Sequence, residues 1–67
     1  MAEIGVVKWY DDGKGVGMIA RQRGADIAVL KKDIKVEGFP SLDPGQRVSF
    51  DAVEGPRGLM AVNVVPL

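Results

Sequence analysis

The sequence contains no cysteine, histidine or threonine, and its only serines are Ser41 and Ser49. Without cysteine the fold has no disulfide and no thiolate metal site, which is compatible with a reducing cytoplasm. Without histidine or cysteine, the two serines lack a familiar base for nucleophilic catalysis. The acidic residues also lack the spacing of a calcium loop. We therefore expect a protein that is not an enzyme, binds no metal and needs no cofactor.

Aromatic residues make up only 6% of the chain, and nine basic residues balance nine acidic ones, so no overall basic field attracts polyanions. Any contact with nucleic acid must therefore be local. A length of 67 residues with 46% hydrophobic content fits one small globular domain. No apolar run approaches the length of a membrane span, and residues 1–12 lack the order of a signal peptide. We expect a soluble, cytoplasmic, single domain over residues 1–67, without membrane contact.

Short runs rich in β-branched residues alternate with glycine-containing turns, and no segment shows a helical stripe. The predicted strands are residues 4–10, 15–20, 26–30, 47–53 and 59–65. The long connection between the third and fourth strands has room for one tight helical turn at its start, before its prolines. Five short strands leave open edges unless the sheet curls into a barrel, so the residues alone predict an OB-like or SH3-like barrel.

The second and third predicted strands are apolar on both faces. Strand alternation places Ile19 on the same face as Gly17, and it makes Ile27 and Val29 good core residues. Val48 and Phe50, at strand spacing, are also expected in the core. The outward face then carries Val16, Met18, Asp26, Ala28 and Leu30. An antiparallel sheet usually keeps one face polar, so this second apolar face calls for another element, a partner or a ligand to cover it.

Four segments with close spacing carry a recognisable pattern: VVKWYDDGKGVGMI at residues 6–19, ADIAVL at 25–30, GFPSLDPGQRVSF at 38–50 and EGPRGLMAVNV at 54–64. Together they resemble the bacterial cold-shock protein family over nearly the whole chain. The resemblance implies an all-β, five-stranded antiparallel OB-type barrel with a short helical turn after the third strand. It also implies that single-stranded RNA or DNA binds across the first three strands. Bases stack there on aromatic rings, each stack contributing about 1–3 kcal/mol.

The resemblance assigns nucleic-acid contacts residue by residue. The positions that keep the family's residue type are Lys8, Trp9, Lys14, Phe39 and Arg57, while Tyr10 replaces one ring with another. The positions that depart are Val16 and Met18, where the family has two phenylalanines, and Ala28, Leu30 and Lys31, where it has Phe, His and Phe. Because several stacking rings are lost, we predict a weak binder of low specificity that acts on RNA structure or gene expression.

The sequence leaves some alternatives open. Trp9 is either a core anchor or a stacking ring, and Phe39 either stacks a base or plugs its loop. The lysines and Arg57 either hold phosphates or are simply solvated, and Lys31 is a cation that meets phosphate in place of a ring. A different function, a protein-interaction or homodimerising regulatory module, would use the apolar patch formed by Val16, Met18, Ala28 and Leu30.

Overall fold

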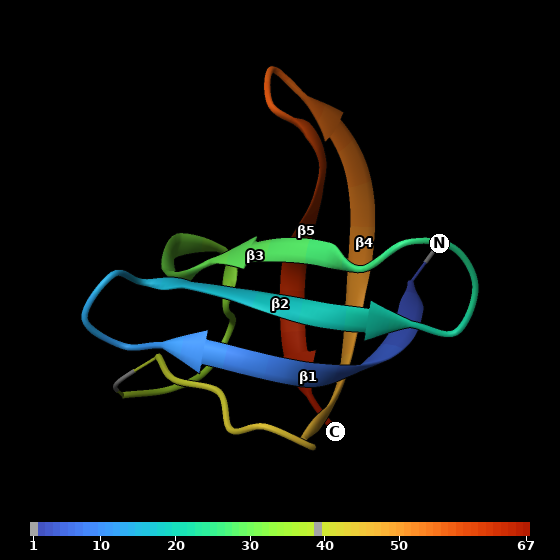
Figure 1. Cartoon of the computed structure of the whole chain (residues 1–67). Helices are drawn as coiled ribbons and strands as arrows, with labels where there is room; N and C mark the ends of the chain where they lie inside the picture. The colour runs from blue at the N-terminus through green and yellow to red at the C-terminus, as the bar shows by residue number, and fades with distance from the viewer. Residues whose placement is uncertain (1, 39) are drawn as a thin grey trace.

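The computed structural model describes residues 2–38 and 40–67, and it forms a closed barrel in the strand order β1-β2-β3-β5-β4 (Figure 1). The strands are β1 Glu3–Asp11, β2 Val16–Arg21, β3 Ile27–Leu30, β4 Arg47–Gly55 and β5 Gly58–Pro66. One turn of 3-10 helix, η1, spans Lys31–Asp33 directly after β3. The predicted five-stranded barrel and its helical turn are both confirmed. No helix in the described part of the chain is long and apolar enough to cross a membrane.

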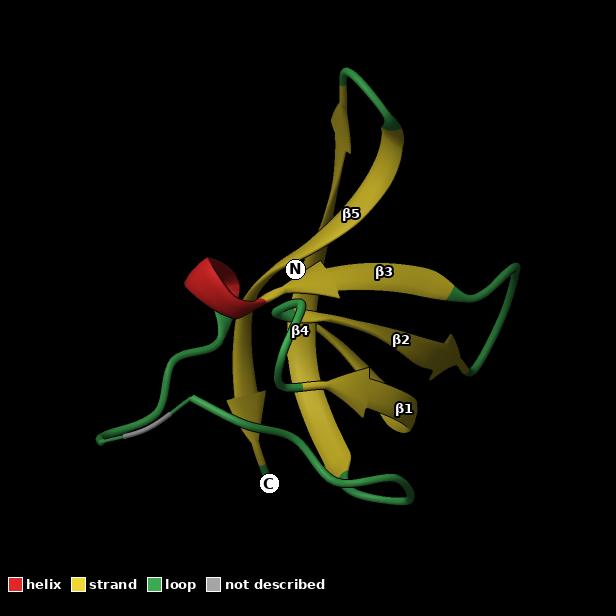
Figure 2. Ribbon diagram, turned by 60° about the vertical axis from the view of Figure 1, so that its left-hand side comes forward, coloured by secondary structure: helices red, strands yellow, loops and turns green. Residues whose placement is uncertain are grey.

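Strands β1, β2 and β3 are antiparallel neighbours, and β4 and β5 cross behind them in the view of Figure 1. The barrel closes where β3 meets β5 as a parallel pair, with Ala28 opposite Met60 and Val29 opposite Ala61. Beyond this contact the β4–β5 hairpin extends away from the barrel body, as both Figure 1 and Figure 2 show. The first three strands therefore present one continuous outer surface, with the hairpin rising beside it.

The core lies inside the barrel and follows the strand alternation. Its buried residues are Val7, Ile19, Ile27, Val29, Ile34, Leu42, Val48, Phe50, Ala61 and Val64. This confirms the inward orientation expected for Ile27, Val29, Val48 and Phe50. Two members, Ile34 and Leu42, come from the long connection between η1 and β4, which covers one end of the barrel. Burying each large aliphatic or aromatic side chain contributes about 1.5–3 kcal/mol.

A bulge in β1 decides which way its end faces. Val7 is opposite Ile19, but Trp9, two residues later, is opposite Met18, so Lys8 is an extra residue in the ladder. An extra residue shifts the alternation of the residues that follow it. Trp9 therefore shares the outward face with Met18, although Val7 points into the core. Without the bulge, alternation would turn the indole inward.

Polar contacts hold the long connection against the barrel at separate points. The hydroxyl Oγ of Ser41 donates to the carboxylate of Asp12 in the β1–β2 turn over 2.8 Å. The backbone N–H of Lys35 donates to the carbonyl of Val64 in β5 over 2.7 Å. These contacts fix the connection to the β1–β2 turn and to β5. Phe39, predicted to lie in this connection, falls outside the described residues.

Candidate nucleic-acid interface

One row of residues crosses the outer surface from β1 to β5. Trp9 pairs with Met18, Met18 pairs with Ala28, and Ala28 pairs with Met60. The next row along β2 and β3 pairs Val16 with Leu30. We call the surface formed by Trp9, Val16, Met18, Ala28 and Leu30 the outer platform. Trp9 is 45% exposed, so its ring belongs to this surface rather than to the core.

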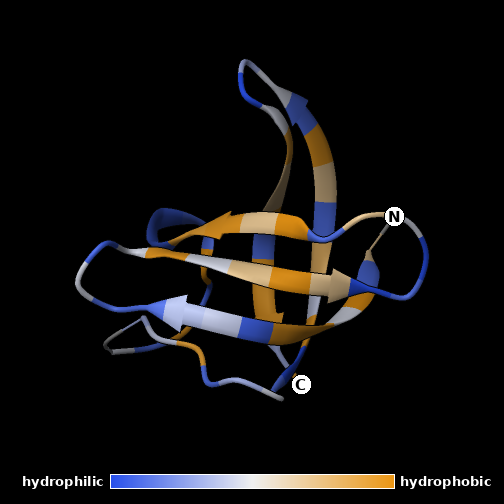
Figure 3. Ribbon diagram, viewed as in Figure 1, coloured by the Kyte–Doolittle hydropathy of each residue, from blue (hydrophilic) through white to orange (hydrophobic). Residues whose placement is uncertain are grey.

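The outer platform is apolar apart from its edges. In Figure 3 the ribbons of β2 and β3 carry mostly hydrophobic colours, whereas the end of β1 is hydrophilic. Val16, Met18, Ala28 and Leu30 are each half-buried among their neighbours. Their predicted outward orientation is confirmed, and the second apolar face of the β2–β3 pair lies at the surface. An apolar surface beside an exposed indole suits the face of a nucleobase.

One cation, Lys8, stands at the edge of the platform next to Trp9. The ammonium Nζ of Lys8 lies 2.7 Å from a carboxylate oxygen of Asp26, in the loop before β3, and both side chains are exposed. This ion pair connects the bulge of β1 to the far side of β2. The positive charge of Lys8 is therefore partly neutralised before any ligand arrives.

Lys14 and Lys31 are brought to the opposite end of the platform by the β1–β2 turn. The backbone N–H of Lys31 donates to the carbonyl of Gly15 over 2.8 Å. Gly15 has a φ of +67°, a left-handed conformation that glycine adopts without strain. Asp11 accepts a bond from the Lys14 backbone N–H over 3.1 Å and so stabilises the turn. Lys14 and Lys31 are both exposed, as phosphate contacts require.

Arg57 lies in a cleft of about 290 Å³ between the β4–β5 hairpin and η1. The apolar lining of this cleft includes Leu30 of the platform together with Val53 and Met60 of the hairpin. Lys32 adds a second positive charge to the lining of the cleft, and Asp33 adds a negative charge. The cleft therefore continues the platform past Leu30 and brings the predicted contact Arg57 to its end.

Tyr10 differs from the other predicted contacts, because it lies on the inward side of β1, opposite Gly17, and packs against the core. Its hydroxyl oxygen is buried and has no hydrogen-bond partner among the described residues. Burial raises the pKa of Tyr10, and the negative charges of Asp12 and then Asp11 raise it further. The ring of Tyr10 thus supports the platform from below rather than extending it.

Two contributors to the surface were not among the predicted contacts. Asp26 was expected to face outward, but its ion pair with Lys8 depends on a bulge that strand periodicity does not reveal. Met60 lies next to the platform because β5 closes the barrel beside β3. The sequence signal that could have identified Met60 as outward-facing is its position next to the inward-facing Ala61 on the same strand. Within residues 2–38 and 40–67, no group of three or more potential metal ligands is found.

A closed five-stranded barrel with an exposed ring and cations on the outer face of its first three strands defines a small OB-type domain. The chain belongs to the cold-shock domain family, because residues 3–67 match the family described as the 'Cold-shock' DNA-binding domain. The resemblance seen in the sequence is thereby confirmed.

Several curated proteins are similar over almost their full length. The chain is 50% identical over 62 residues to cold shock protein CspC of Bacillus subtilis, covering 92% of this chain and 94% of that protein. It is 45% identical over 67 residues to cold shock-like protein CspA of Shewanella violacea, covering 98% and 96%. Among solved structures, the chain is similar to drosophila Unr CSD456, with a TM-score of 0.83 and 18% sequence identity. The match covers 100% of this chain and 27% of that chain. That structural match supports the fold.

Proposed function

We propose that this protein binds unpaired RNA or DNA on the outer platform, with nucleobases stacked on Trp9 and packed on the neighbouring aliphatic side chains. The observation that carries the proposal is the 45% exposure of the Trp9 indole beside Met18 and Lys8. Family membership supports it, because the matched family is described as DNA-binding. Residues 1–67 would act as a single binding unit in the cytoplasm.

The composition of the platform sets the expected strength. Each base stacked on an aromatic ring contributes about 1–3 kcal/mol, and stacking tolerates every base. Trp9 is the aromatic member of the platform, and the remaining four members are aliphatic. Two or three forfeited stacks would cost roughly 2–9 kcal/mol in binding free energy, with neighbouring losses not strictly additive. The binding is therefore weak and low in specificity, with Lys8, Lys14, Lys31 and Arg57 as the phosphate contacts.

Such binding needs no bond to be made or broken. A protein that binds only unpaired strands stabilises them by mass action and shifts a hairpin toward its open form. This accounts for an effect on RNA structure or gene expression without catalysis. The proposed activity is that of an RNA chaperone.

The test is an NMR titration with a short oligothymidylate, followed in parallel by Trp9 fluorescence. We expect the indole emission to be quenched and the amide signals of β1, β2 and β3 to shift. An oligonucleotide concentration of about 1 mM is about a thousandfold above a micromolar Kd. No change in either signal at this concentration would contradict the proposal.

The alternative of a protein contact through Val16, Met18, Ala28 and Leu30 is separated by a second measurement. A protein interface on these residues would be lost in Met18→Asp and would depend little on salt. Nucleic-acid binding depends strongly on salt, because phosphate contacts release counterions.

A further inference from the structure

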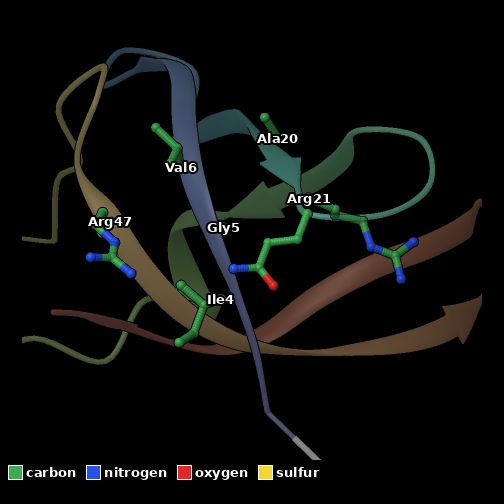
Figure 4. A pocket seen from close by; sticks show the side chains of 7 residues that line it. Ile4, Gly5, Val6, Ala20, Arg21 and Arg47 are labelled. Carbon is green, nitrogen blue, oxygen red and sulfur yellow. The ribbon is translucent and has the colours of Figure 1, made fainter.

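A second groove opens on the barrel next to the outer platform, at the end away from η1. It has a volume of about 220 Å³ and lies over β1, β2 and the start of β4 (Figure 4). Its apolar lining is Ile4 and Val6 of β1 and Ala20 of β2, and Arg47 stands at its β4 side. The predicted binding residues do not include any of these.

The groove adjoins the platform along β2. Val6 pairs with Ala20, and this row follows the row that pairs Trp9 with Met18. Residues two apart on a strand share a face and lie about 7 Å from each other, so Met18 and Ala20 form one strip. Val6 is 41% exposed, close to the exposure of Trp9. The apolar strip on β2 thus leads from the platform to the groove, and the exposed ion pair of Lys8 with Asp26 spans β2 beside it.

Charge favours an anionic occupant at this end. This groove and a neighbouring one that shares Ile4 and Gln22 are lined by three arginines, Arg21, Arg23 and Arg47, and by one acid, Glu3. Glu3 is already held by two 3.0 Å hydrogen bonds from Arg21. Arg47 is exposed, pairs with Val6 across the sheet, and has no side-chain partner within the described ranges. A local basic excess therefore exists in a chain whose net charge is zero.

We propose that a single strand bound on the outer platform continues past Trp9 into this groove, with a base or sugar on Val6 and Ala20 and a phosphate on Arg47. The inference rests on the proposed function and extends it, because the binding site then includes the groove as well as the outer platform. OB folds occupy about 4–16 nucleotides, so such an extension lies within their range. A guanidinium suits this role, since it presents two parallel donors to a phosphate.

The experiment measures affinity against length with oligothymidylates of about 4 to 12 nucleotides. A longer strand offers a short site more positions, and this alone raises the apparent affinity. For the unmodified protein we expect affinity to rise with oligonucleotide length more steeply than this statistical effect. Arg47→Gln should bind the shortest strand normally and lose the gain on the longest one. One phosphate contact fewer lowers the salt slope by about 0.7, so a fourfold rise in salt weakens the unmodified protein about 2.6-fold more than the variant.

Lys35→Gln is the matched control, because it removes the same charge from an exposed position that lines neither groove. We expect it to retain the length-dependent gain. Arg47→Gln is an exposed change, and thermal melting verifies that its fold is kept. NMR adds a second readout: the methyl signals of Val6 and Ala20 should shift with the longest strand and not with the shortest.

The outcomes that overturn the inference are distinct from those that overturn the function. Equal effects of Arg47→Gln and Lys35→Gln at every length, or no gain with length, would reject the extension while leaving platform binding intact. Absence of binding at any length would reject both. A dimer that forms with rising protein concentration and is dissolved by Val6→Asp, without any length effect, would assign the groove to a second copy of the chain.

Discussion

The ammonium of Lys8 lies 2.7 Å from the carboxylate of Asp26, and this contact joins residues 18 apart in the chain at the edge of the outer platform. Both groups are exposed, so the pair adds at most about 1 kcal/mol to stability. In the proposed binding mode, the carboxylate beside Lys8 would compete with phosphate for the same cation. The edge of the platform beside Trp9 is thus less positive than Lys8 alone would make it.

Asp26→Asn should therefore strengthen binding of an oligothymidylate and steepen its salt dependence by up to about 0.7 in slope, as expected for one added phosphate contact. Titrations by fluorescence anisotropy at several salt concentrations measure this. Asp43→Asn, which removes an exposed acid from the long connection, is the control. A lower affinity for Asp26→Asn would mean that Asp26 itself bonds to the bound strand.

Trp9→Ala should weaken binding of single strands roughly 5- to 150-fold, because one stack worth about 1–3 kcal/mol is removed. Anisotropy of a labelled oligothymidylate measures the change without relying on the indole. Leu59→Ala serves as control, since Leu59 is a large exposed hydrophobic residue on β5 outside the platform. Equal affinities for the two variants would contradict base stacking on Trp9.

Met18→Phe should strengthen binding at least about fivefold by adding a ring next to Trp9, if the new ring stacks a base. Met18 pairs with Trp9 on the outward face, so a ring at this position has room to face the ligand. The same ring in Leu59→Phe should leave affinity unchanged. No gain in Met18→Phe would show that the aliphatic platform is not in contact with bases.

Tyr10→Phe should stabilise the protein by about 1 kcal/mol near neutral pH, because the buried hydroxyl has no partner in the described structure. Burial, aided by Asp12 and Asp11, raises the pKa of Tyr10 above its ordinary value of 10.0, so the folded state holds the phenolic proton more tightly than the unfolded chain. That contribution is complete below pH 10 and is lost as pH rises through the raised pKa. Chemical denaturation from neutral to alkaline pH should show a smaller loss for Tyr10→Phe. A destabilised variant would indicate that the hydroxyl is bonded.

Gly17→Ala should destabilise the fold by about 1–3 kcal/mol, because an added Cβ would lie 2.7 Å from the Trp9 carbonyl and 2.7 Å from Cδ1 of Tyr10. Relieving this overlap would move β1 away from β2 and displace the indole, so binding should fall as well. Gly13→Ala is the control, since the nearest atom to its added Cβ is a side-chain oxygen of the exposed Asp11 at 3.3 Å, with no backbone atom closer than 4 Å. Thermal unfolding compares the two, and an unchanged midpoint for Gly17→Ala would contradict the tight β1–β2 approach.

Sequence patterns predicted much of this protein because its strands obey simple alternation. The runs around Ile19, Ile27, Val29 and Phe50 placed the core correctly, and the same alternation put Met18 and Leu30 outside. The glycines and prolines located the turns, and one short helical turn was expected where η1 lies. Each of these features depends on neighbours only a few residues away.

Other features depended on contacts between distant segments, which local patterns do not encode. Alternation from Val7 would send Trp9 inward, and only the register between β1 and β2 reveals the bulge that turns it out. The same β1–β2 register sets the inward ring of Tyr10 and the position from which Lys8 reaches Asp26. The parallel pairing of β3 with β5 places Met60 beside Ala28.

By itself the amino-acid sequence determined that five strands form and which side chains are apolar enough to bury, because these properties reside in single residues and their spacing. Only the tertiary structure decided which apolar side chains remain at the surface and which charges meet there. Barrel closure and strand register set those contacts, and both depend on the whole chain folding around one core.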